Sequence, residues 1–389
     1  MGRLYLHISQ KDLSQRNAET THVLEVARAF SSAGRSVRVV APGVGRCESA
    51  VPFAIDYLPA VSRPRLLRLL SYEAALWLYL ITRPELWARR ASFYVRKGTA
   101  LLAPLVLARL LRLPAVLEVN EVYPEIAVHR PLAPSVLAAL QVLYSLSYRL
   151  ASAIVVPVQT LADALQGMGL PRGKIHVVSN GVNTGVFHPR EQTACRRALG
   201  LDESAAYVCY TGSLSAWQGV DVLLDAFGRV SKRHPSAFLI LLGGGPMRSA
   251  LEEQARLLGI GERVLFRGPV PFEQVPQYVA AATVCVVPVT VGTHSPVKLF
   301  EYLACKKPVI GSDLPGVREV ISSYGCGWLA RPGDADDWQA KIEAALACPR
   351  EELEAMGEKG RQAVQRNHTW EAAGREILSL LDGRGGQQQ

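Results

Sequence analysis

Short apolar segments alternate with amphipathic helical segments along this chain, and the alternation runs through two separate series. The first series opens with apolar residues 4–9, a helical pattern over 19–33 and a second strand at 37–41. The second series starts afresh at Tyr207 and continues through a strand at 308–312. Such alternation is typical of parallel sheets covered on both faces. It predicts an α/β protein of two Rossmann-like, doubly wound domains that face each other across a cleft, with ligands at the carboxyl ends of the strands.

The bulk composition favours two domains, because a chain of 389 residues is too long for one ordinary core. Its seven cysteines include no CxxC pair and no Cys/His spacing that suits zinc, so no metal site is predicted. Met1 leads into a strand rather than a signal peptide, which favours a reduced, cytoplasmic protein. The expected division is an N-terminal domain over 1–189, a linker over 190–203, a C-terminal domain over 204–365, a helix over 366–382 that can cross back to the N-terminal domain, and a disordered tail over 383–389.

Residues 293–313 place a cation where a helix end disfavours one. Ser295 suits a helix N-cap and Pro296 the first helical position, so Lys298 falls in the first turn, at the positive end of the helix dipole. Helix N-termini are anion-binding sites, and a bound anion would make this lysine favourable. Glu301 follows in an otherwise apolar helix, and the stretch therefore predicts a site for phosphate and sugar. A surface lysine without a ligand, or a Lys298–Glu301 pair within the helix, are the alternatives.

Two glycine-containing turns follow strands of the second series. Gly212 and Ser213 come after one strand, and three glycines at 243–245 come after the next. Glycine lacks a Cβ atom, so backbone N–H groups at these turns can approach a pyrophosphate closely. A tight turn without a ligand is the alternative for the three glycines.

Five segments of the chain resemble, in order and spacing, the retaining glycosyltransferases of family four, which have the GT-B fold. They are SNGVNTGVF (179–187), YTGSLSAWQGVDVLLDAF (210–227), LLGGGPMRSALE (241–252), RVLFRGPV (263–270) and SPVKLFEYLACKKPVI (295–310). One such motif would be weak, but five in register are specific. The first half resembles the family mainly in its strand–helix rhythm and in VLEVNEVYPE (116–125).

The resemblance implies a nucleotide-sugar donor in the C-terminal domain, an acceptor over the N-terminal domain, and transfer with retention of anomeric configuration and no obligatory cofactor. Lys298 is then expected to stabilise the departing diphosphate, and Glu301 to hold the donor ribose. The backbone of 264–270 matches the segment that reads the base. The residues expected to bind the donor are Gly212, Ser213, Gln218, Gly243, Gly244, Arg267, Val270, Thr293, His294, Ser295, Pro296, Val297 and Leu299.

The chain departs from the family pattern at several positions. Many members carry an arginine and a lysine where Ser213 and Gln218 stand, and a glutamate at the position of Thr293. Lys298 is therefore expected to carry more of the charge stabilisation. In the first half, Arg16 and Asn17 stand where the family usually has two glycines, and Asn120 stands where it often has a histidine. The residues expected at the acceptor loop are Arg16, Asn17 and Glu19, and the expected catalytic group is Lys298, Glu301, Asn120 and Glu121.

Residues 62–112 hold much of the net charge of +9. Their basic residues, up to Arg96 and Lys97, are interleaved with apolar and aromatic ones such as Phe93. No window of about 20 residues is free of charge, so a spanning helix is not predicted. A basic, aromatic surface lying on an anionic bilayer and a solvated basic face beside a core helix explain the pattern equally well, and nucleic acid is a weaker third partner. A peripheral site on the inner face of the plasma membrane would use Arg65, Arg68, Trp77, Trp87, Arg89 and Arg90.

The acceptor and the donor base are only partly constrained. The basic surface favours a lipid-linked or envelope glycan acceptor, while other glycans and small molecules stay open, and UDP is favoured only because it is frequent in the family. Two other functions stay open. One is a sugar-nucleotide epimerase or a phosphorylase of related fold. The other is a catalytically degenerate GT-B module that binds a glycan or a partner. Ser213, Gln218 and Thr293 favour it, because they replace charged residues of the family pattern.

Overall fold

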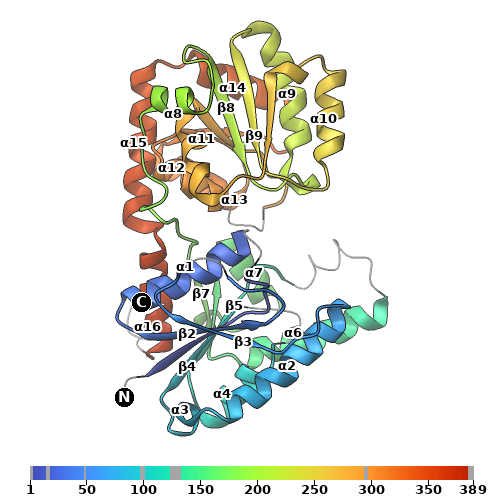
Figure 1. The fold of residues 1–389 in the computed structure, drawn as a ribbon, viewed down its shortest axis with the longest axis vertical. Coiled ribbons are helices and arrows are strands. Elements are labelled where there is room, and N and C mark those ends of the chain that lie inside the picture. The colour runs from blue at the N-terminus through green and yellow to red at the C-terminus, as the bar shows by residue number, and fades with distance from the viewer. Residues whose placement is uncertain are drawn as a thin grey trace. The chain divides into compact units, whose positions relative to one another are not determined.

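The structure is a computed structural model that describes residues 3–14, 18–47, 50–96, 101–122, 133–292 and 297–383 (Figure 1). Its contacts divide the chain into two compact units. We call Met1–Asn180 with Trp370–Gln389 the N-unit, and Gly181–Thr369 the C-unit. Six residues predicted from the sequence to lie at a site fall outside the described residues, namely Arg16, Asn17, Thr293, His294, Ser295 and Pro296.

The N-unit contains a seven-stranded sheet. Its strands are β1 (Leu4–Ile8), β2 (Ser36–Pro42), β3 (Ala54–Leu58), β4 (Ala91–Arg96), β5 (Ala115–Glu118), β6 (Ala153–Val156) and β7 (Ile175–Val177). They pair in parallel in the order β3-β2-β1-β4-β5-β6-β7. Every residue of β1, β4, β5 and β6 is buried, because helices cover both faces of the sheet.

Two groups of helices cover this sheet (Figure 1). The N-unit helices are α1 (Ala18–Ser32), α2 (Arg65–Ile81), α3 (Pro84–Trp87), α4 (Ala103–Leu111), α6 (Pro134–Leu150), α7 (Gln159–Gly167) and α16 (Trp370–Leu381), with a 3-10 turn η1 (Arg172–Lys174). Helices α1 and α16 pack together over one face, where Phe30 and Ile377 share a core. Helices α2, α4, α6 and α7 bury residues such as Leu76 and Tyr148 in the core of the other face. In the described part of the chain, no helix is long and apolar enough to cross a bilayer.

The C-unit repeats this plan with six parallel strands. They are β8 (Ala206–Thr211), β9 (Ala237–Leu242), β10 (Val264–Gly268), β11 (Val284–Val287), β12 (Val309–Ser312) and β13 (Gly327–Ala330), in the order β10-β9-β8-β11-β12-β13. The helices are α8 (Gln192–Ala198), α9 (Val220–Arg233), α10 (Arg248–Leu257), α11 (Val275–Ala281), α12 (Val297–Ala304), α13 (Pro315–Tyr324), α14 (Ala335–Ala347) and α15 (Arg350–Asn367), with 3-10 turns η2 (Ala216–Gln218), η3 (Gly261–Arg263) and η4 (Phe272–Gln274).

Helices cover both faces of the C-unit sheet as well. Residues of α9, α10 and α14, such as Phe227 and Trp338, fill one core, and residues of α11, α12 and α13, such as Phe300 and Val317, fill the other. Both units therefore confirm the prediction of two Rossmann-like α/β domains with parallel sheets.

The sequence prediction was wrong for residues 91–96, which it assigned to a basic surface. These residues form β4, which lies between β1 and β5, so Phe93 is fully buried and Arg96 is only 8% exposed. The strand is short and directly follows the exposed Arg89 and Arg90. Because the neighbouring residues are basic and aromatic, the sequence pattern did not indicate that 91–96 form a central strand.

Asp382, the residue after α16, joins this helix to the rest of the N-unit through an ion pair and a hydrogen bond, which we call the Asp382 clamp. Asp382 accepts a hydrogen bond from the Tyr5 hydroxyl at 2.5 Å and pairs with the Arg35 guanidinium at 2.6 Å. The Asp382 side chain is only 13% exposed, so these contacts are partly desolvated. The clamp joins the last described helix to the start of the sheet, 377 positions earlier in the sequence.

We expect Asp382→Asn to lower the free energy of unfolding by about 1.5–3 kcal/mol, the usual contribution of hydrogen bonds to a charged group. The amide that replaces the carboxylate removes the charge that Arg35 faces. Urea denaturation, followed by hydrogen exchange in α1 and α16, measures the change and shows whether it arises at this clamp.

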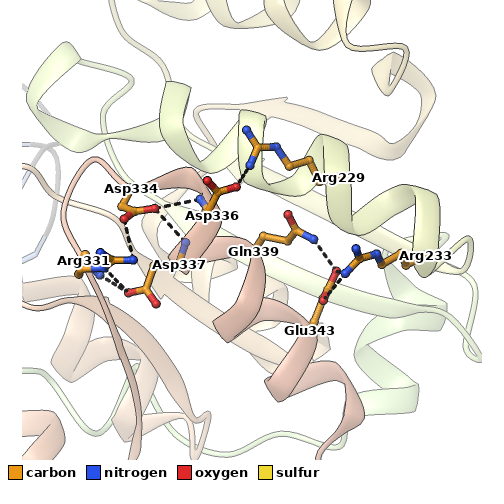
Figure 2. A network of polar contacts seen from close by, with 8 residues as sticks. All are labelled: Arg229, Arg233, Arg331, Asp334, Asp336, Asp337, Gln339 and Glu343. Atoms are coloured by element: carbon orange, nitrogen blue, oxygen red, sulfur yellow. Dashed lines mark hydrogen bonds and ion pairs between the residues drawn. The ribbon is translucent and has the colours of Figure 1, made fainter.

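A surface network between α9 and α14 supplies the matched control (Figure 2). There Arg229 pairs with Asp336, and Arg233 pairs with Glu343 at 3.1 Å. The Asp336 side chain is 81% exposed, so Asp336→Asn should cost no more than about 1 kcal/mol. Equal losses in the two variants would contradict a special role for the Asp382 clamp.

Candidate functional site

Three loops of the C-unit come together at the carboxyl ends of β8, β9 and β10. The Gly212 N–H donates to the Leu242 carbonyl at 2.9 Å, and the Gly243 N–H donates to the Gly268 carbonyl at 2.8 Å. The Leu214 N–H in turn donates to the Gly244 carbonyl at 2.9 Å. These bonds tie the loops into one backbone platform, which we call the glycine platform and which consists of 212–214, 243–245 and 268.

Glycine is required at several positions of this platform, and two of them lie next to the Lys298 side chain or the loop that contacts it. Gly243 has φ of 135°, and a Cβ atom there would lie 2.0 Å from the Gly212 carbonyl oxygen. Gly212 has φ of 138°, and a Cβ atom there would lie 2.6 Å from the Lys298 ammonium nitrogen. The platform therefore brings bare backbone next to a cation, which is an arrangement suited to an anion.

Lys298 in the first turn of α12 points its ammonium at neutral partners. Its Nζ atom donates to the Gln218 Oε1 atom at 2.7 Å and lies 4.1 Å from the centroid of the Tyr210 ring. The Tyr210 hydroxyl lies 2.7 Å from the Ser213 carbonyl oxygen and 3.0 Å from Gln218 Oε1. The lysine predicted from the sequence is thus next to the glycine platform rather than in free solvent.

The charges of Lys298 and of Glu301 are both sensitive to pH near neutrality. Burial lowers the pKa of Lys298 to about 7, and the Glu301 carboxylate opposes that shift. Burial raises the pKa of Glu301 to about 7, and the Lys298 ammonium opposes it. A bound anion would favour the protonated lysine.

The other described donor-site candidates lie in varied surroundings. Ser213 and Arg267 are exposed, Val270 and Val297 are half-buried, and Gln218 is buried. The Leu299 side chain is fully buried in the C-unit core, so only its backbone could touch a ligand.

The N-unit holds a buried cluster of polar residues at the carboxyl ends of β4 and β5. Its centre is Glu118, which is 2% exposed and pairs with Arg96 at 2.5 Å. The Tyr94 hydroxyl donates to Glu118 at 2.8 Å, the Asn120 amide donates at 2.6 Å, and His22 Nε2 lies 3.2 Å away. We call these five residues the Glu118 cluster.

The Glu118 cluster is ionised at its centre and neutral at its histidine. Burial is the largest single effect and favours a raised pKa for Glu118, but the Arg96 charge, His22 and the hydrogen bonds from Asn120 and Tyr94 together outweigh burial and bring this pKa to about 2. Burial lowers the pKa of His22 to about 3, so its imidazole is neutral at pH 7. Because a carboxylate only accepts hydrogen bonds, the Asn120 amide nitrogen faces Glu118 and its amide oxygen is left as an acceptor.

A small cavity adjoins the Glu118 cluster. It has a volume of about 10 Å³, roughly that needed for one water molecule, and its lining includes Asn180 and Trp370. The sequence interpretation did not assign Arg96, Tyr94 or His22 to a site. A signal was present, because Arg96 and Glu118 each end an apolar strand and the two face each other in register between β4 and β5.

The remaining N-unit candidates lie apart from this cluster or at its edge. Asn120 belongs to the cluster and is half-buried, whereas the neighbouring Glu121 is exposed. Glu19 is exposed and pairs with Lys11 at 2.6 Å. Of the candidate membrane residues, Trp87, Arg89 and Arg90 are exposed, and Arg68 and Trp77 are half-buried.

Gly243→Ala should disrupt the glycine platform, because the new methyl group would overlap the Gly212 carbonyl and the residue would keep a strained φ. We expect a stability loss of about 1–3 kcal/mol or more, measured by thermal denaturation. Gly244→Ala is the matched control for stability, since a Cβ atom there would lie 3.7 Å from its nearest neighbour. Equal stability of the two variants would contradict the close approach at Gly243.

Comparison with known proteins covers almost the whole chain. The family model described as "Glycosyltransferase Family 4" matches residues 20–186, and the one described as "Glycosyl transferases group 1" matches residues 191–363. The chain is 31% identical over 213 residues to the D-inositol 3-phosphate glycosyltransferase of Segniliparus rotundus, covering 53% of this chain and 46% of the relative. It is 30% identical over 222 residues to a GDP-mannose-dependent phosphatidylinositol monomannoside mannosyltransferase of Mycolicibacterium smegmatis, covering 55% of this chain and 58% of the relative.

The chain thus spans about half the length of the curated relatives that it matches. Solved structures match its fold over nearly its full length. Sucrose-phosphate synthase from Thermosynechococcus elongatus superposes with a TM-score of 0.81 at 20% identity, covering 98% of both chains. Anabaena Alr3699/HepE, in complex with UDP and glucose, superposes with a TM-score of 0.79 at 18% identity, covering 98% of this chain and 99% of the other. With two family models in sequence and this fold in both units, the chain belongs to the family-4-type glycosyltransferases of GT-B fold.

Proposed function

We propose that this protein transfers a sugar from a nucleoside-diphosphate donor to an acceptor hydroxyl, with the donor bound at the glycine platform of the C-unit. The observation that carries the proposal is the Lys298 ammonium beside Gly212, where a cation meets closely packed, bare backbone. Cleavage of the sugar–phosphate bond builds negative charge on the departing diphosphate, and stabilising such charge is often the largest catalytic contribution. Lys298 and the platform N–H groups would provide that stabilisation.

The remaining roles follow from the same placement. Glu301, near Lys298 on α12, would hold the ribose hydroxyls. The acceptor oxygen would bond to the sugar carbon as the sugar–phosphate bond breaks, and its proton would pass to an oxygen of the departing diphosphate. We infer retention of configuration and no obligatory metal from the family-four pattern of the second half. UDP is our first candidate for the donor nucleotide, and the Anabaena protein solved with UDP supports it. GDP is the main alternative, because one relative is named as GDP-mannose-dependent.

We infer that the acceptor is presented at a membrane surface, where the protein binds peripherally from the cytoplasmic side. The N-unit exposes large apolar side chains on α2, α4 and α6, and α4 contacts both of the other two helices. We call this group the apolar patch, and its members are Leu66, Leu67, Leu70, Leu78, Ile81, Leu110, Val136, Val142 and Leu146. Exposed arginines such as Arg63, Arg89 and Arg109 belong to the same part of the chain. Apolar residues beside arginines suit an anionic lipid surface.

The donor site is tested with UDP, GDP, ADP, CMP and dTDP in a thermal-shift screen, followed by calorimetry with the best ligand and with pyrophosphate. At 100 times its Kd, a ligand should add about 2.7 kcal/mol of stability. Lys298→Ala should weaken the best nucleotide and pyrophosphate alike, and should reduce turnover by roughly 100- to 1,000-fold. Glu301→Gln should weaken the nucleotide but not pyrophosphate, because pyrophosphate has no ribose.

A stabilising nucleotide whose affinity does not depend on Lys298 would contradict this donor site. No stabilisation by any of the five would instead favour the non-catalytic binding module. Release of free sugar or an epimer from the donor, without any acceptor, would favour the related chemistries.

The membrane surface is tested by sedimentation with vesicles of phosphatidylcholine alone and with added phosphatidylglycerol. We expect binding to the anionic vesicles, and the double variant Leu66→Ser, Leu70→Ser should weaken it by roughly 10- to 100-fold through lost apolar burial. Leu257→Ser is the matched control, because Leu257 is 72% exposed on the C-unit. Equal loss with Leu257→Ser, or equal binding to both kinds of vesicle, would sink this assignment.

A further inference from the structure

The proposed donor site has a neutral amide at a position where many family members carry a lysine. Gln218 is only 5% exposed, and its amide oxygen contacts the one lysine at the glycine platform that the structure describes. We propose that Gln218, oriented by Tyr210, is a positioning residue that holds the Lys298 ammonium at the phosphate-binding platform. This inference rests on the proposed donor site and names the groups that hold its single described lysine in place.

The backbone of Gln218 is held rigidly. Gly219, which follows it, has φ of 66°, and a Cβ atom there would lie 2.0 Å from the Pro288 carbonyl oxygen. The Thr290 N–H donates to the Trp217 carbonyl at 3.0 Å on the other side. The 3-10 turn η2 is therefore fixed against the segment that follows β11, and the Gln218 side chain leaves from a fixed point.

Hydrogen-bond chemistry then fixes the orientation of the Gln218 amide. An ammonium can only donate, so the amide oxygen, not the amide nitrogen, must face Lys298. The Tyr210 hydroxyl lies 3.0 Å from the same oxygen and 2.7 Å from the Ser213 carbonyl oxygen, so it shares its one hydrogen between these two acceptors, and this also favours an oxygen at that position. The face of the Tyr210 ring, 4.1 Å from Nζ, attracts the ammonium as well. Two neutral groups thus confine the cation without neutralising it.

This arrangement determines how much positive charge reaches a ligand. Among the described residues, the groups that face Lys298 are Gln218 from η2, Tyr210 from β8, and the carboxyl group of Glu301 from its own helix. Burial lowers the pKa of Lys298 to about 7, so the ammonium is lost as the pH rises through neutrality. A hydrogen bond to the charged form raises that pKa, so the Gln218 oxygen maintains charge as well as position.

Gln218→Met, Gln218→Glu and Tyr210→Phe test the inference, with UDP and pyrophosphate titrated calorimetrically at about pH 6 and about pH 8. Gln218→Met should weaken both ligands by roughly 10- to 100-fold, with the larger loss at the higher pH. Gln218→Glu should also weaken both, because its carboxylate repels the diphosphate, but its loss should depend less on pH. Tyr210→Phe keeps the ring and should cost less than Gln218→Met.

The ligand-free protein gives a second readout that does not depend on the donor. In ¹⁵N-lysine NMR, the Nζ resonance of Lys298, assigned with Lys298→Arg, should titrate at lower pH in Gln218→Met and at higher pH in Gln218→Glu. Gln274→Met is the matched control, because Gln274 is exposed and also lies on a 3-10 turn. It should change neither readout.

Unchanged titration of Lys298 in folded Gln218→Met would overturn the positioning role. Unchanged affinity for UDP and pyrophosphate in that variant would overturn it too. If neither ligand binds the wild type while the Lys298 titration still depends on Gln218, the positioning role stands and the donor-site proposal fails.

Discussion

Parallel strand pairing is the constraint on which the rest of this molecule depends. Every strand pair described within the two sheets is parallel, so in each unit the carboxyl ends of the strands meet at one edge. The Arg96–Glu118 pair lies at this edge of the N-unit sheet, and Gly212, Gly243 and Gly268 lie at the same edge of the C-unit sheet. Parallel strand direction alone therefore brings the residues of both sites to one edge of each sheet.

The two edges handle charge in opposite ways. In the N-unit, Glu118 is surrounded by an arginine, a tyrosine, a histidine and an amide, so the buried charge is compensated on the spot. In the C-unit, the direct contacts of Lys298 are a neutral amide oxygen and a ring face, and the Glu301 carboxyl group on its own helix is the charged group that acts on it. Removing one partner from a compensated buried pair is costly, which suits a structural centre. A cation whose neighbouring carboxyl group, Glu301, has a pKa raised to about 7 suits a site that binds an anion.

The sequence alone was sufficient for the architecture and for the glycine platform, because both depend on local patterns. The strand–helix rhythm gave both sheets, and the spacing from Gly212 to Lys298 pointed to one site. Asn120 was expected at a site, but the rest of the Glu118 cluster was not predicted, because Arg96 and Glu118 lie 22 positions apart and pairing in register, not any motif, joins them. β3, β4 and β13 were not predicted, and in β4 the apolar run is short and follows exposed arginines. Gln218 was expected at the donor site, but its contact with Lys298 depends on three-dimensional packing.

The return of α16 to the N-unit sets an order for synthesis of the chain. During translation, residues 1–180 leave the ribosome long before Trp370 does, so α1 covers its face of the sheet without its partner helix. Side chains of α1 that face α16, such as Ala29 beside Gly374 and His22 beside Trp370, lack these partners until α16 has been made. The N-unit, although first in the sequence, can be completed only after the C-unit has been made, and a nascent chain that stalls late would expose an unfinished core to aggregation or chaperones.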